Sequence, residues 1–220
     1  VERPGRFETG GGTTFFGTHG GTFYALSSGG VSEIVPEGDR SMEIAALLLS
    51  QRPYAKDALL LGCVPLAVSV SLAALRPDLA VTWCPCDAPY GIRVLEAARA
   101  EGLVPTNVCA AGVTPQRALA AAVDAYDAVV VMPPPATTLE GAAWRQEAFA
   151  RRVRRATRRT GAALFGLDCD VAALTPEKAE LLGSALRGIR CAWPESGLFV
   201  PGAGGWWVAA QVANLAYGAS

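Results

Sequence analysis

The sequence contains a single histidine, His19, and no group of cysteines at the spacing of a zinc site. Cys84 and Cys86 are the only neighbouring cysteines, and C-x-C is neither a zinc motif nor a thiol-exchange motif. We therefore expect no metal. Most of the six cysteines fall in apolar runs, which is typical of small core residues in a reducing compartment. His19 stands among glycines, where a solvated turn residue is the simplest interpretation and a ligand or base is the alternative.

Charge is also scarce, because charged residues make up 18% of the 220 residues while hydrophobic residues make up 51%. The formal net charge of −1 argues against a dedicated nucleic-acid binder, which would be strongly basic. The apolar composition favours extensive burial, including burial against a partner surface. There is no secretory signal, although the chain begins at Val1 and a segment could precede it. We expect a cytoplasmic chain, either free or peripheral to the inner face of a membrane.

The chain is organised around residues 56–90. Apolar runs at 58–62 and 79–84 predict two buried strands, and the helical spacing at 67–75 predicts a helix between them. This order is that of a right-handed βαβ unit, whose first loop faces the crevice where nucleotide-like ligands bind. A membrane span is the alternative, because residues 58–75 carry no charge over 18 positions.

The remaining chain alternates between strand and helix patterns. Glycine turns between short β-branched and aromatic runs predict a small antiparallel sheet in residues 1–34. Helices are predicted at 36–51, 87–101, 114–125, 138–159 and 175–186. Strands are predicted at 106–110, 126–132 and 163–169, with a closing hairpin within 191–212. This alternation predicts a doubly wound α/β sheet with an N-terminal β appendage.

Four collinear segments resemble the spermidine synthase (polyamine aminopropyltransferase) family, especially the soluble domains of bacterial members fused to transporter-like segments. They are FYALSSGGVSEIVPEGDRSMEIA, RPYAKDALLLG, YDAVVVMPPPATTLEGAAWRQEAFARRVRRATRRTGAALFGL and GLFVPGAGGWWVAAQ. The third, with T-T-x-x-x-x-x-W before EAF and a basic helix, is the most specific. The resemblance implies an α/β, Rossmann-like (class I methyltransferase-like) domain at 36–220, with a mainly parallel sheet between helices. A small antiparallel β-sheet region at 1–35 precedes it.

The nucleoside-binding positions that the resemblance implies are degenerate. The family has a glycine-rich loop with an aspartate after the first strand, but here only Gly62 remains and Pro65 stands near the acid's place. After the second strand the family has Glu-x-Asp for the ribose. This chain has Pro85-Cys86-Asp87, so that Asp87 is left with the role of a helix cap. The adenine-side aspartate aligns with Thr114.

The catalytic positions that the resemblance implies are also lost. Two aspartates after the fourth strand would orient the amine and accept its proton, but residues 132–135 are Met-Pro-Pro-Pro. No Asp or Glu lies within 63–86 except Asp78, and none lies within 128–139. The family's tyrosine and paired acids at the start of the first long helix appear as Ser41, Glu37 and Gly38. A cationic amine would therefore find no carboxylate to offset its desolvation.

From these losses we predict that the chain is not an enzyme. It would be a non-catalytic, spermidine-synthase-like structural or accessory subunit of a larger complex, either free of a membrane or associated with one, without a cofactor and with Gly62 and Asp87 as vestigial ligand positions. One alternative is an aminopropyltransferase or S-adenosylmethionine-dependent methyltransferase with a rebuilt active site. Another is a small-molecule or anion sensor that uses the crevice.

Two features are candidates for binding such a partner. The first is a basic surface on the helix predicted at 138–159, whose core face would hold Phe149, Val153 and Ala156. Its candidate residues are Arg151, Arg154, Arg155 and Arg158. They suit an acidic protein or an anionic membrane surface better than nucleic acid, and a merely solvated face is the alternative. The second feature is Trp206 and Trp207 in the uncharged run 196–220.

Overall fold

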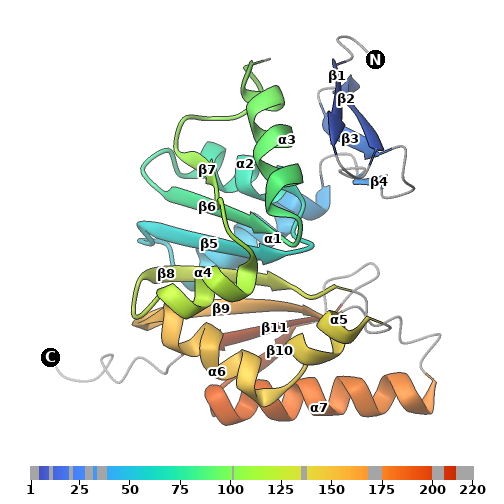
Figure 1. The fold of residues 1–220 in the computed structure, drawn as a ribbon. Helices are drawn as coiled ribbons and strands as arrows, with labels where there is room; N and C mark the ends of the chain where they lie inside the picture. Colours follow the sequence, from blue (N-terminus) through green and yellow to red (C-terminus); the bar gives the residue numbers. More distant parts are fainter. Residues whose placement is uncertain are drawn as a thin grey trace, which may run out of the picture.

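The computed structural model describes residues 5–9, 12–19, 22–27, 32–33, 39–100, 102–134, 138–167, 175–199 and 206–211. These residues form two sheets and seven helices (Figure 1). The smaller sheet has four antiparallel strands in the order β1-β2-β3-β4 and lies beside α3. Its strands are β1 (Gly5–Thr9), β2 (Gly12–His19), β3 (Thr22–Ser27) and β4 (Ser32–Glu33). The predicted N-terminal antiparallel sheet is therefore confirmed, whereas the boundary at residue 35 stays a prediction.

The larger sheet has seven strands in the order β10-β11-β9-β8-β5-β6-β7. Its parallel strands are β5 (Asp57–Gly62), β6 (Ala80–Pro85), β7 (Val108–Ala110), β8 (Tyr126–Met132) and β9 (Thr157–Leu167). The antiparallel strands β11 (Trp206–Gln211) and β10 (Gly197–Phe199) close one edge, as the predicted hairpin required. The first helices are α1 (Asp39–Gln51), α2 (Leu66–Leu75) and α3 (Ala88–Ala100). The others are α4 (Pro115–Ala121), α5 (Leu139–Trp144), α6 (Glu147–Ala156) and α7 (Pro176–Ala192).

Helices cover both faces of the larger sheet, so its central strand is buried on both sides. Leu60 packs into a core with α1, α2 and α3, whereas Leu59 and Leu61 pack into a second core with α5, α6 and α7. All three leucines have an exposed fraction of 0%. Burial on both faces explains why this strand is a continuous apolar run and does not alternate with polar residues. The predicted α/β, Rossmann-like (class I methyltransferase-like) architecture is confirmed.

The uncharged stretch at 58–75 divides into β5, a turn and α2, and does not form one long helix. In the part of the chain that the structure describes, no helix combines the length and the apolar character needed to cross a bilayer.

The helix predicted at 138–159 is wrong in its extent. The chain breaks at Arg145 and Gln146, between α5 and α6, and residues 157–159 already belong to β9. The guanidinium of Arg145 is buried and donates to the carbonyl oxygens of Pro134 (2.9 Å) and Gly141 (2.7 Å). These contacts stabilise the break between the two helices. One of them comes from Pro134, which lies before α5 and outside any helical pattern.

Asp127 ties together the amino ends of three parallel strands. Its Oδ2 accepts hydrogen bonds from the backbone N–H groups of Lys56 (2.7 Å) and Asp57 (3.2 Å). The same oxygen forms an ion pair with the guanidinium of Arg158 (2.7 Å). Burial alone would raise the pKa of Asp127, but the hydrogen bonds from Arg158 and the two amides outweigh it and lower the pKa. These polar groups at the amino ends of the strands are engaged in holding the sheet together. A ligand site is therefore expected at the opposite edge, where the carboxyl ends of the strands lie.

Candidate functional site

The carboxyl ends of β5, β6 and β8 meet at the point where the strand order reverses. Gly62 at the end of β5 is in register with Pro85 of β6 on one side and with Met132 of β8 on the other. The chain runs outward from β5 to β6 and β7, and then returns to place β8 on the other side of β5. In doubly wound sheets, ligands bind outside the carboxyl ends of the strands at such a reversal. The candidate site therefore lies over Gly62.

Gly62 is required here because the protein packs closely against it. Its φ is +86°, and a Cβ at this position would lie 2.3 Å from the carbonyl oxygen of Met132 and 2.7 Å from the ring of Trp144. The indole of Trp144, brought by α5, therefore lies over the end of β5. It is buried, and its Nε1 has no hydrogen-bond acceptor among the described residues.

The loop after β5 is held from both neighbouring strands. The N–H of Cys63 donates to the carbonyl oxygen of Met132 (2.8 Å). On the other side, Nε1 of the fully buried Trp83 donates to the carbonyl oxygen of Val64 (2.7 Å). Pro65 then adopts the extended conformation (φ −60°, ψ 144°) that precedes α2. This loop is fixed by hydrogen bonds even though it has lost the glycines that the resemblance implies.

Polar groups from four elements line this edge. Cys63 is exposed, and Cys86 is half-buried after β6. The side chain of Cys63 and then burial raise the pKa of Cys86. The carboxylate of Glu140 on α5 lies close enough to Cys86 to raise its pKa further, and accepts a hydrogen bond from Nε2 of Gln116 on α4 (2.6 Å). Glu140 is thus a carboxylate held at the crevice.

Sequence reasoning missed Glu140. It looked for acids up to residue 139, where the family has its two aspartates, and found none. Glu140 stands in the first turn of α5, which begins with a side-chain cap from Thr138 to the N–H of Gly141 (2.9 Å). An acid in a capped first turn is ordinary helix chemistry, so the sequence carries no further signal for its role.

Asp87 caps α3, as predicted. Its Oδ1 accepts the N–H of Tyr90 (3.0 Å), and its side chain is exposed. We expect Asp87→Asn to keep the stability of the fold, because the amide oxygen can replace this acceptor. Asp87→Ala should lower the free energy of unfolding by about 1 kcal/mol. Urea denaturation of both variants is the measurement, and an equal loss in both would contradict the capping role.

The four predicted arginines lie on α6 and β9, and the two predicted tryptophans lie on β11. Arg151 pairs with Glu147 one turn earlier (2.6 Å), and Arg154 lies over the ring of Trp193 at 5.9 Å. Arg155 is exposed near the end of α6. Arg158 is in β9 and pairs with Asp57 (2.9 Å) as well as Asp127, so it does not share a helical face with the other three. Trp206 and Trp207 are in β11, opposite Leu167 and Gly166 at the carboxyl end of β9, so they lie at the same edge of the sheet but three strands from β5. Partner binding by these residues stays a prediction.

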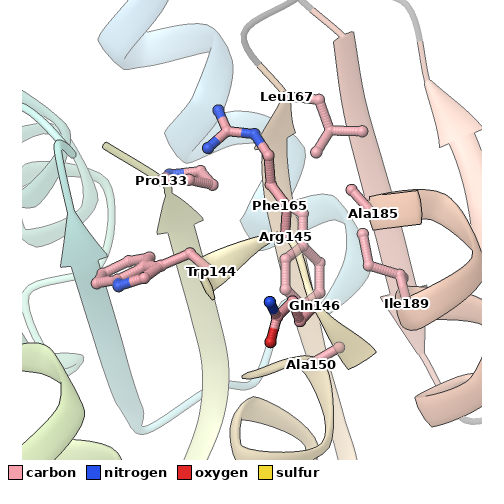
Figure 2. Close-up of a pocket in the computed structure, with 9 residues that line it drawn as sticks. All are labelled: Pro133, Trp144, Arg145, Gln146, Ala150, Phe165, Leu167, Ala185 and Ile189. Atoms are coloured by element: carbon pink, nitrogen blue, oxygen red, sulfur yellow. The ribbon is translucent and has the colours of Figure 1, made fainter. Parts of the chain in front are cut away.

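A small apolar recess lies beside the crevice, behind Pro133 (Figure 2). Its volume is about 260 Å³ including the part open to solvent. Phe165 and Leu167 of β9 line one side, and Ala185 and Ile189 of α7 line another (Figure 2). Among the described residues that line it, Arg145 alone is charged, and its guanidinium is held by the carbonyl groups described above. Only about 10 Å³ of it can be reached by the centre of a water molecule, so the recess has room for about one water, and its described lining offers no acid for a cationic ligand.

Solved structures resemble this fold along nearly the whole chain. A spermidine synthase in complex with the transition-state analogue AdoDATO matches with a TM-score of 0.68 and 14% identity, over 96% of this chain and 74% of that one. The spermidine synthase of Thermotoga maritima matches with a TM-score of 0.66 and 13% identity, over 96% and 73%. A T. thermophilus 16S rRNA methyltransferase in complex with AdoMet and guanosine matches with a TM-score of 0.51 and 16% identity, over 95% and 44%. No family model and no curated protein sequence matches the chain.

These matches contradict the prediction that the chain is not an enzyme, because the structures it resembles are named as spermidine synthases and methyltransferases. They give no support for an accessory role in a membrane-associated complex. The physical weakness of that prediction is Glu140, a carboxylate that reaches the crevice from outside the aligned positions. The comparisons establish the architecture at these low identities: the chain has a spermidine-synthase-like, class I methyltransferase-like fold.

Proposed function

We propose that this chain is a transferase that takes an alkyl group from an S-adenosyl-type sulfonium donor bound at the carboxyl edge of β5 and β6. The observation that carries the proposal is the carboxylate of Glu140, held over this edge by Gln116 (2.6 Å) beside the half-buried Cys86. The proposal departs from the sequence-based expectation of no cofactor. It agrees with the alternative given in the sequence analysis, a transferase whose active site has been rebuilt.

The residues present fit such a donor. Asp87 uses one carboxylate oxygen to cap α3 and leaves the other open to ribose hydroxyls. The buried Nε1 of Trp144 lacks an acceptor among the described side chains and backbone groups, and it lies beside Gly62. The amino terminus of α2 follows directly after the loop at 63–65, where the helix dipole favours a carboxylate. A sulfonium donor supplies an electrophilic carbon, so the protein needs to position its reactants and requires little acid–base chemistry.

Glu140 is the group that this chain contributes to the acceptor. Its carboxylate can accept a hydrogen bond from the attacking hydroxyl, thiol or amine, orient it toward the donor and take its proton. Gln116 fixes one oxygen of Glu140 and leaves the other for the acceptor. Apolar side chains of the small recess behind Pro133, among them Phe165 and Ile189, lie beside this position.

The charges favour methyl transfer. Decarboxylated S-adenosylmethionine ends in a bare ammonium group that requires carboxylates, and the stretch 63–86 offers only Asp78. Asp78 is bound to Lys56 (2.6 Å) and Arg76 (2.8 Å), and Lys56 lies at the amino end of β5, far from the crevice. The amino-acid end of S-adenosylmethionine carries both charges and needs less compensation. Aminopropyl transfer remains a second candidate, because the N-terminal sheet and the 96% coverage are shared with spermidine synthases.

Donor binding tests the proposal. Titration calorimetry of the purified chain should give micromolar dissociation constants for S-adenosylmethionine and S-adenosylhomocysteine, about −8 kcal/mol. Tighter binding of the decarboxylated donor would identify the reaction as aminopropyl transfer and exclude methyl transfer. If no S-adenosyl compound binds at millimolar concentration, the transferase proposal fails.

Glu140→Gln separates acceptor chemistry from donor binding. With methyl-labelled donor and a small-molecule extract as the source of acceptor, we expect labelled product to form about tenfold more slowly in this variant. The loss corresponds to about 1.4 kcal/mol, in the range of one hydrogen bond to a charged group. The donor dissociation constant should not change. Asp78→Asn is the matched control, because it also removes one exposed carboxylate but away from the crevice. Equal rates in the two variants would count against a role for Glu140.

A further inference from the structure

Cys63 and Cys86 lie at equivalent positions on neighbouring strands. Each directly follows the last register pair of β5 and β6, which is Gly62 with Pro85. Adjacent strands are about 4.8 Å apart. This spacing falls within the range of about 4.4–6.8 Å between the Cα atoms of a disulfide. The sheet register thus brings the two cysteines to the ends of neighbouring strands, at the spacing that a disulfide between adjacent strands needs.

The two thiols lie close enough to interact, because the side chain of Cys63 is the largest influence on the pKa of Cys86. Cys63 is exposed and can meet an oxidant from solvent, whereas Cys86 is half-buried behind it. A metal is a poorer explanation for the pair, because the described part of the chain holds no group of three or more metal-ligating side chains. The arrangement is that of an accessible thiol with a resolving partner, as in redox-sensitive cysteine pairs.

We propose that Cys63 and Cys86 form an oxidant-sensitive dithiol that closes into a disulfide across the ends of β5 and β6. With a hydroperoxide as oxidant, the sulfur of Cys63 attacks one peroxide oxygen, the O–O bond breaks, and a sulfenic acid and water (or an alcohol) result. The sulfur of Cys86 then attacks the sulfur of Cys63, the S–O bond breaks, and the proton of Cys86 leaves with the hydroxide as water. The two thiols lose two electrons and the peroxide gains them.

The disulfide would lie at the mouth of the candidate crevice. It would tie the loop at 63–66 to the turn that carries Asp87 into α3. This consequence rests on the transferase proposal: oxidation would also lower the affinity for the donor, because the disulfide would replace two thiols at the mouth of the donor crevice. The formation of the bond itself does not depend on that proposal.

The remaining described cysteines lack this arrangement. Cys84 is buried, donates to the carbonyl oxygen of Val113 (3.4 Å), and burial raises its pKa to about 12. Cys109 is exposed in β7, but the register places Thr82 opposite it. Cys191 is exposed near the end of α7. Cys169 lies outside the described residues. Exposure alone therefore does not distinguish Cys63, whereas its partner across the register does.

Oxidation of the full chain tests this inference. The reduced protein is treated with one equivalent of hydrogen peroxide and digested without reductant, and the peptides are identified by mass spectrometry. We expect the product to have lost two free thiols and to contain a peptide pair that joins Cys63 to Cys86. Dithiothreitol should restore both thiols. A crosslink through Cys109 or Cys191, or oxidation of single thiols without any crosslink, would overturn the proposal.

Serine variants supply the controls. Cys63→Ser and Cys86→Ser should each abolish the crosslink, whereas Cys109→Ser and Cys191→Ser should leave its yield unchanged. Circular dichroism confirms that each variant is folded. Should a serine variant fail to fold, binding of phenylarsine oxide to the unmodified chain gives a second test, because this probe requires two adjacent thiols. A stoichiometry of one supports the pair, and no binding contradicts it. Because neither readout uses the donor, a chain that forms the bond but binds no S-adenosyl compound contradicts the transferase proposal alone.

Discussion

Gly62→Ala is expected to destabilise the fold by about 2–5 kcal/mol. A φ of +86° costs a residue with a Cβ about 1–2 kcal/mol. The new methyl group would also lie 2.3 Å from the carbonyl oxygen of Met132 and 2.7 Å from the ring of Trp144. Overpacking of a buried site typically costs a further 1–3 kcal/mol. Because the contact with Met132 is with backbone, the structure can relieve it only by moving β5 away from β8.

Gly102→Ala is the matched control for this prediction. Gly102 also has a positive φ (+71°), but a Cβ there would meet nothing within 4 Å. This variant should therefore lose only the backbone share, about 1–2 kcal/mol. Urea denaturation of both variants measures the difference. Equal losses would mean that the packing of Trp144 over Gly62 does not constrain this site.

The elements that could be predicted from the sequence are those whose bounds are set locally. The strand at 126–132 was placed correctly, because a buried apolar run is followed directly by proline. The split between α5 and α6 could not be predicted in this way. No proline stands between residues 139 and 156 to end a helix, and the break depends on the buried guanidinium of Arg145, which binds the carbonyl oxygen of Pro134, eleven residues earlier.

The site was predictable in its place but not in its chemistry. Gly62 ends the first strand of the βαβ pattern, Asp87 was named from the family resemblance, and both stand at the predicted edge. That Cys63 and Cys86 are neighbours follows only from the register of β5 and β6. The position of Glu140 follows only from the path of α5 over the crevice. Counting missing acids at aligned positions led to the prediction of a chain without catalysis. That count did not include Glu140, because this carboxylate comes from α5 and not from the aligned positions.

Trp83→Phe is expected to be among the most damaging conservative substitutions in this chain. Trp83 is fully buried in β6, and its Nε1 donates to the carbonyl oxygen of Val64 (2.7 Å). Phenylalanine fills most of the volume but leaves that buried carbonyl without its donor, which costs about 1–3 kcal/mol. The smaller ring adds a cavity worth roughly 1 kcal/mol. We therefore expect a total loss of about 2–4 kcal/mol.

Trp193→Phe isolates the contribution of the hydrogen bond. Trp193 is equally buried, at 1% exposed, and its Nε1 has no acceptor among the described residues. Its substitution should therefore lose only the packing share, roughly 1 kcal/mol. Since Val64 belongs to the loop after β5, Trp83→Phe should also weaken donor binding measured by calorimetry, whereas Trp193→Phe should not. Similar losses of stability in the two variants would show that the loop is held by its contact with Met132, and that the indole of β6 contributes only volume.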